Sequence, residues 1–174
     1  MTPLRIDYSK VAPGAVAGMY AANAYFDSCS IPQTLRRLAE LRVSQINGCT
    51  YCIWLHSRQA RALGEGEHRI AAIANWRSAS CFSGPERAAL HWTELVTRIS
   101  AGAPSDDAFA DMRHCFDERQ IVDLTAIVSN MNALNRMAMS FRLEAPVKDG
   151  GGVDRSRRGL ALRFRLPGRV IHAT

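Results

Sequence analysis

Apolar residues recur along this chain at intervals of three and four positions, the spacing of one face of an α-helix. No stretch shows the strict alternation of apolar and polar residues that is typical of a half-buried strand. The pattern predicts an all-α fold of about six to seven helices joined by short loops, either orthogonal or bundle-like.

Turn residues indicate where the first helices begin and end. Pro13-Gly14 precedes a helix of about fifteen residues, and Pro32 opens the next one, which Asn47-Gly48 ends. We expect a third helix to run from Cys49 to Leu63, with Gly64 as the glycine just beyond its end.

Capping residues indicate the later helices. Ser83 with Glu86, and Asp117 with Gln120, have the spacing of capping boxes, in which each side chain satisfies an exposed amide at the helix start. These pairs predict helices over about 85–100 and 118–142, and the helical pattern predicts others over 67–76 and 104–116.

The composition changes at Ala145, which divides the chain into a helical domain (1–144) and a basic, Gly/Arg-rich tail (145–174). The tail has seven basic and two acidic residues, and so contains most of the net charge of +6. The body is close to neutral, so we expect no nucleic-acid function. The tail is interpreted as an appendage that is poorly ordered or packs on a neighbouring subunit.

The cysteine content bears on location and chemistry. The chain has five cysteines, no secretory-signal pattern and no run of 18 apolar residues, which favours a cytoplasmic protein without a membrane segment. In a reducing compartment, a closely spaced cysteine pair is more often catalytic or metal-binding than structural.

The candidate chemistry lies in the segment that begins the third predicted helix, where Cys49, Cys52 and His56 have the spacing CxxCxxxH. At 100° per residue these three side chains fall within about 60° of each other on one helix face. Thiols at this spacing can form a disulfide, and the amides of a helix start favour thiolate over thiol. His56 lies one turn beyond Cys52, where it can accept or relay a proton.

Two other interpretations of these residues remain open. They could be two core cysteines with a surface histidine, or three ligands of a zinc site that lacks a recognisable fourth. Thioredoxin-like chemistry uses the same dithiol but needs alternating strands and helices, which this pattern lacks.

The run LRVSQINGCTYCIWLHSRQARALGEGEHRIAAIANW closely resembles the core of the alkylhydroperoxidase D (AhpD)-like proteins, within the carboxymuconolactone decarboxylase superfamily. The resemblance extends over about residues 5–142 and includes Ser83–Ala89 and the segment Val122–Phe141 with Asn135-Arg136. The CxxCxxxH core is specific to the redox branch of the superfamily, so decarboxylation is disfavoured.

The resemblance implies a helical subunit that assembles into trimers or hexamers and needs no cofactor or metal. It implies that Cys52 attacks the peroxide and becomes a sulfenic acid, and that Cys49 resolves it to a disulfide. A dithiol donor, such as dihydrolipoamide or a thioredoxin-like protein, would then reduce the disulfide. His56 would belong to a proton relay that activates Cys52.

One position departs from the family pattern. Family members have a relay glutamate about twelve residues before the first cysteine, where this chain has Arg37. Glu40 lies one turn further along the same helix face. It is a candidate for the relay, and the alternative is that it pairs with Arg36 or Arg37 on the surface.

These observations favour a homo-oligomeric, thiol-dependent peroxidase with Cys52, Cys49, His56 and Glu40 as catalytic residues. The alternatives are a non-enzymatic redox-responsive oligomer and a zinc-site protein. We further expect Cys49, at the helix start, to lie nearer solvent than Cys52. Apolar residues in helices 85–100 and 118–141 exceed what one buried face needs, which independently predicts a subunit interface.

Overall fold

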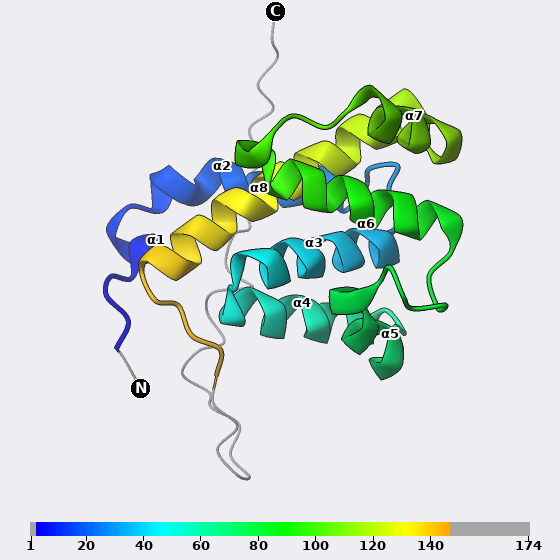
Figure 1. The fold of residues 1–174 in the computed structure, drawn as a ribbon. Helices are drawn as coiled ribbons and strands as arrows, with labels where there is room; N and C mark the ends of the chain where they lie inside the picture. Colours follow the sequence, from blue (N-terminus) through cyan, green and yellow to red (C-terminus); the bar gives the residue numbers. More distant parts are fainter. Residues whose placement is uncertain (1–2, 147–174) are drawn as a thin grey trace, which may run out of the picture.

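The computed structural model describes residues 3–146, and every regular element in that range is helical (Figure 1). The all-α prediction is confirmed, with one helix more than expected because α1 is a single turn without apolar periodicity. The α-helices are α1 (Tyr8–Val11), α2 (Pro13–Phe26), α3 (Gln33–Asn47), α4 (Thr50–Ala62), α5 (Glu67–Ala72), α6 (Gly84–Thr97), α7 (Asp106–Cys115) and α8 (Glu118–Ser140).

Helix α3 is the centre of the domain and packs against α4, α6 and α8 (Figure 1). Its side chains Leu38 and Leu41 are fully buried, as the three-residue apolar spacing predicts. Helices α3 and α4 form a tight helical hairpin, and Gly48 between them has a φ of 73°. This left-handed conformation suits glycine, which has no Cβ to clash with the backbone.

Both predicted capping boxes are present. The Ser83 hydroxyl accepts from the amide of Glu86 at the start of α6, and the Asp117 carboxylate accepts from that of Gln120 at the start of α8. Two predicted helices are shorter than expected, because each ends in a short 3₁₀ segment, Ile73–Asn75 after α5 and Ile99–Ala101 following α6.

The two ends of the described chain meet at the end of α8. The amide of Arg5 donates to the carbonyl of Phe141, and the rings of Tyr8 and Phe141 lie 5.4 Å apart. This contact brings Tyr8 and Leu143 to the cavity described below.

Within residues 3–146, every helix is too short or too polar to serve as a membrane span. The predicted basic tail at 145–174 lies almost wholly outside the described residues.

Candidate active site

Cys49 and Cys52 lie at the start of α4, as the sequence predicts. Cys49 is the N-cap residue, one position before the first helical residue, and Cys52 is in the first turn. Both are free thiols, and their Sγ atoms are 2.6 Å apart and share a hydrogen bond. The predicted proximity of the two sulfurs is therefore confirmed.

The expectation that Cys49 lies nearer solvent is wrong. Cys49 and Cys52 are 2% and 3% exposed, and both belong to the main apolar core. The N-cap position exposes a side chain only when nothing packs over the helix start, and here α8 packs against both α3 and α4. Of the two cysteines, it is Cys52 that lines the cavity beside the site.

The two thiols differ in their electrostatic surroundings. The pKa of Cys49 is lowered by its hydrogen bond with Cys52 and by the backbone amides of Cys52 and Tyr51, which outweigh burial. The pKa of Cys52 is raised by its hydrogen bond to Cys49 and by burial. In the reduced protein, Cys49 is therefore the sulfur that first holds the negative charge.

Glu40 on α3 and His56 on α4 face each other, and both are buried. The Nδ1 atom of His56 is 3.1 Å from the Oε2 atom of Glu40, an ion-pair distance. The ring is turned so that this contact is not a well-directed hydrogen bond. The structure thus brings together the histidine and the carboxylate that the sequence singled out.

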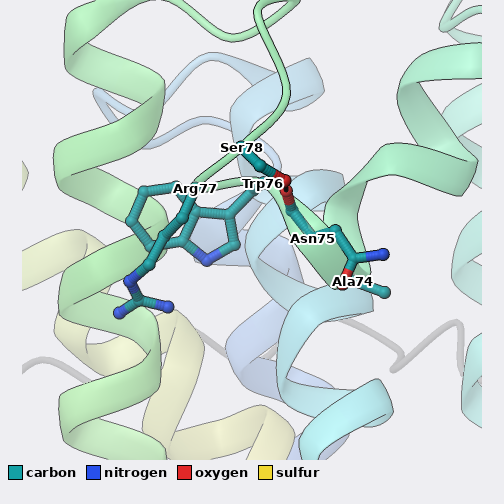
Figure 2. Close-up of a pocket in the computed structure, with 5 residues that line it drawn as sticks. All are labelled: Ala74, Asn75, Trp76, Arg77 and Ser78. Atoms are coloured by element: carbon teal, nitrogen blue, oxygen red, sulfur yellow. Dashed lines mark hydrogen bonds between the residues drawn. The ribbon is translucent and has the colours of Figure 1, made fainter.

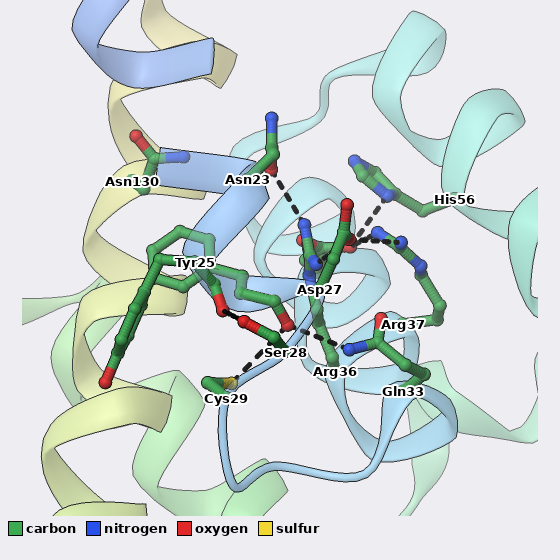
Figure 3. A network of polar contacts seen from close by, with 12 residues as sticks. Asn23, Tyr25, Asp27, Ser28, Cys29, Gln33, Arg36, Arg37, His56 and Asn130 are labelled. Carbon is green, nitrogen blue, oxygen red and sulfur yellow. Dashed lines mark hydrogen bonds and ion pairs between the residues drawn. The ribbon is translucent and has the colours of Figure 1, made fainter. Parts of the chain in front are cut away.

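Two arginines hold the carboxylate of Glu40. The Nε atom of Arg36 donates to Oε1 at 2.8 Å, and the Nη1 atom of Arg37 donates to Oε2 at 2.6 Å. Figure 3 shows Arg36, Arg37 and His56 converging on this point. The expected pairing of Glu40 with arginine therefore exists, but it is buried, since Arg36 is only 1% exposed.

Arg36 is in turn fixed by the end of α2. Its Nη1 atom donates to Asp27 and its Nη2 atom to Asn23, both at 2.7 Å. The guanidinium also lies 5.4 Å from the centre of the Phe26 ring. Sequence reasoning assigned no such role to Arg36, because the partners come from a separate helix.

This environment keeps Glu40 ionised. Burial raises the pKa of the carboxyl group, but the opposing effects of His56, Arg37 and Arg36 are larger and lower it to about 2. At neutral pH, Glu40 is therefore a permanent negative charge beside His56 and not a proton acceptor.

A cavity of about 280 Å³ connects these groups. Its lining residues include the charged or polar side chains of Arg36, Arg37, Glu40 and His56, together with Cys52. The apolar and aromatic lining residues are Tyr8, Tyr20, Tyr51, Leu55, Met131, Leu134, Ala138 and Leu143. The cavity could therefore hold a small molecule with an apolar body next to the Cys52 sulfur.

A second hollow of similar size lies beside Trp76 and Arg77 (Figure 2). Its remaining lining residues, Ala74, Asn75 and Ser78, include no thiol, carboxylate or imidazole. Trp76 donates to Glu94 at 2.9 Å, and Arg77 lies over the indole ring, so this region joins α6 to the preceding segment. We assign the site to the cavity at Cys52.

Residues 3–146 contain no group of three or more His, Cys, Asp or Glu side chains that could bind a metal ion. The zinc interpretation of Cys49, Cys52 and His56 therefore has no support in this part of the chain.

The chain is similar to several known proteins. Residues 13–95 match the carboxymuconolactone decarboxylase family. The uncharacterized protein YdfG of Bacillus subtilis (strain 168) is 35% identical over 144 residues, which are 83% of this chain and 98% of YdfG. A crystal structure from Agrobacterium tumefaciens, of a protein of unknown function assigned provisionally as the antioxidant defence protein AhpD, has a TM-score of 0.81. That protein is 34% identical, and the match covers 84% of this chain and all of the other.

The chain belongs to the AhpD-like proteins of the carboxymuconolactone decarboxylase family. A more distant similarity is to the debrominase Bmp8, with a TM-score of 0.70 and 19% identity over 78% of this chain and 73% of Bmp8. At that identity the likeness concerns the fold alone. The fold is thus shared with a protein named for a different activity, and the site itself must indicate what this chain does.

Proposed function

We propose that this AhpD-like protein is a thiol-dependent peroxidase that reduces hydroperoxides through a dithiol–disulfide cycle of Cys52 and Cys49. The observation that carries the proposal is a buried pair of free thiols in contact, one of which lines a cavity beside a histidine and an ionised glutamate. These are the parts that sulfenic acid formation and resolution require.

The first step begins with a proton transfer between the sulfurs. Cys49 has the lower pKa, but Cys52 is the thiol on the cavity wall, so the proton of Cys52 passes to the Cys49 thiolate across their hydrogen bond. The Cys52 thiolate then attacks the peroxide: an S–O bond forms, the O–O bond breaks, and the leaving alkoxide takes a proton from His56. Cys52 is thereby oxidised to sulfenic acid, and the peroxide is reduced to an alcohol.

The second step closes the disulfide. Cys49 gives up its proton to the neutral His56 and attacks the Cys52 sulfur, so that the S–S bond forms and the S–O bond breaks. The hydroxide that leaves takes that proton from His56 and departs as water. A dithiol reductant, of the dihydrolipoamide or thioredoxin-like kind, then reduces the disulfide by thiol–disulfide exchange and is itself oxidised.

Glu40 supports these steps without taking the proton. As a fixed anion 3.1 Å from the Nδ1 atom of His56, it holds the ring beside Cys52. Arg36 and Arg37 act through Glu40 as positioning residues.

The test is peroxide consumption by the reduced protein in the absence of any reductant. We expect one equivalent of hydroperoxide to be consumed per subunit, with a disulfide mapped to Cys49 and Cys52 afterwards. No consumption, or a disulfide that involves Cys29, Cys81 or Cys115, would exclude the proposed cycle.

A second candidate is a redox-responsive protein that uses the same dithiol as a sensor. The burial of both sulfurs favours it, because an external reductant has to reach them through the cavity. Turnover distinguishes the two: a peroxidase consumes many equivalents when dihydrolipoamide or thioredoxin is supplied, whereas a sensor stops after one.

A further inference from the structure

Three asparagine side chains form a partly buried network near the dithiol. Asn47 lies at the end of α3, two residues before Cys49, and Asn132 and Asn135 lie one turn apart on α8. The Nδ2 atom of Asn47 donates to the Oδ1 atoms of Asn132 at 3.0 Å and Asn135 at 2.9 Å. The network therefore ties the turn that precedes Cys49 to α8.

A backbone carbonyl determines which way each amide points. The Nδ2 atom of Asn132 donates to the carbonyl oxygen of Val128 at 3.0 Å, an atom that can only accept. Asn132 must therefore present its oxygen to Asn47, which in turn must present its amide nitrogen to both partners. It follows that Asn135 presents its oxygen to Asn47 and points its two N–H groups the other way.

One of those N–H groups donates to the Ser44 hydroxyl at 3.4 Å. The side chain also interacts with the Cys52 thiol and lowers its pKa, an effect smaller than those of Cys49 and burial, which raise it. Asn135 is fully buried, so water does not compete for this donor.

We propose that Asn135 is the hydrogen-bond donor that stabilises the anionic sulfur of Cys52. Each sulfur then has its own donors: backbone amides at Cys49, and the Asn135 side chain at Cys52. This arrangement lets the negative charge move from Cys49 to Cys52 when a peroxide enters the cavity. The inference rests on the proposed function, because it concerns the nucleophile of that reaction.

The test uses the full chain with Cys49→Ser, so that Cys52 is the only thiol of the pair. The rate of alkylation of Cys52 by iodoacetamide is measured against pH, with the modified peptide identified by mass spectrometry. Asn135→Asp keeps an oxygen for Asn47 but replaces the donor by a carboxylate, and Asn135→Ala removes the side chain. For both we expect the apparent pKa of Cys52 to rise by about one unit or more, with alkylation at pH 7 about tenfold slower.

Asn132→Ala is the matched control, since Asn132 is buried, lies on the same helix and contacts the same Asn47 nitrogen. It should lose stability to urea but leave the apparent pKa of Cys52 unchanged. An equal shift in the Asn132 and Asn135 variants, or no shift in either Asn135 variant, would overturn the proposal. Alkylation requires no peroxide, so this outcome is separate from failure of the peroxidase reaction.

Discussion

Cys49 and Cys52 are in contact, yet they have different surroundings. Cys49 is enclosed by the core and receives backbone amides, whereas Cys52 faces the cavity and the histidine one turn further along α4. A two-cysteine cycle requires such a difference, because one sulfur has to react with the peroxide and the other has to react only afterwards, with the sulfenic acid.

Substitution of each cysteine should separate these roles. With a sulfenic-acid trap added during peroxide treatment, Cys52→Ser should give no label at the pair. Cys49→Ser should react once, be labelled at Cys52 and stop before a disulfide forms. Label at Cys49 in the Cys52→Ser protein, with none at Cys52 in the Cys49→Ser protein, would reverse the assignment.

The ionised state of Glu40 makes stability depend on pH. Its pKa is about 2 in the fold and 4.5 in the reference state, so the unfolded chain binds the proton more readily. The stabilisation is therefore complete above pH 4.5 and is lost as the pH falls toward 2. A shift of this size corresponds to about 3 kcal/mol at neutral pH.

We therefore expect Glu40→Gln to lower the free energy of unfolding in urea at pH 7, and the difference from the unsubstituted protein to shrink at pH 3. Glu67→Gln is a suitable control, because Glu67 forms a solvent-exposed ion pair with Arg61. It should have little effect at either pH. A Glu40→Gln deficit that is the same at pH 7 and pH 3 would contradict the assigned ionisation.

At the scale of elements, the site depends on the hairpin of α3 and α4. Glu40 comes from α3, both cysteines lie at the start of α4 with His56 one turn further, and Gly48 joins the two helices with its left-handed backbone. No heavy atom lies within 4 Å of a Cβ added at Gly48, so alanine would be disfavoured there by backbone conformation alone.

Gly48→Ala should lower the free energy of unfolding by about 1–2 kcal/mol, the cost of a left-handed conformation for a residue with a Cβ. Gly18→Ala is the contrasting substitution, because Gly18 has the ordinary helical backbone of α2. A Cβ added there also has no heavy atom within 4 Å. That substitution should be neutral or stabilise by up to about 1 kcal/mol. Urea unfolding curves of the two variants measure the contrast, and equal midpoints would refute it.

At the scale of the whole molecule, several large apolar side chains remain exposed. Six of them lie in the N-terminal segment, α1, α2 and α8, namely Leu4, Ile6, Val11, Tyr25, Val122 and Met139. The others are Leu63, Phe109 and Ile99, and Ile99 follows α6 within the range 85–100 where the sequence had also indicated an excess. The distribution favours an interface formed by the N-terminal region with α8.

We predict a homo-oligomer, for which a trimer or hexamer is the expectation from the family resemblance. Light scattering at micromolar concentration should give a mass that is a multiple of the 19.2 kDa subunit. Replacement of exposed Val11 and Val122 by aspartate should shift that mass toward the monomer. A monomeric unsubstituted protein would contradict the prediction.

The tail should be dispensable for the thiol chemistry. Truncation after Glu144 retains Leu143, the last residue within 3–146 that lines the cavity, and removes most of the net positive charge. Peroxide turnover should remain within about twofold of the full chain, which corresponds to less than about 0.5 kcal/mol in the barrier. Loss of turnover with the oligomer preserved would show that the tail takes part in the site.

Local features of the amino-acid sequence determined much of this protein by themselves. The apolar spacing, the capping pairs at Ser83 and Asp117 and the turn at Asn47-Gly48 predicted the helices. The CxxCxxxH spacing predicted that two thiols meet at a helix start, because helix geometry alone determines contacts over one or two turns.

Contacts between residues far apart in sequence were decided only by the tertiary structure. Burial of Cys49 depends on the packing of α8, and the ionised state of Glu40 depends on Arg36, which α2 holds through Asn23 and Asp27. Asn135 reaches Cys52 from 83 positions away. No local pattern specifies such neighbours, because burial and electrostatic environment arise only when separate helices pack together.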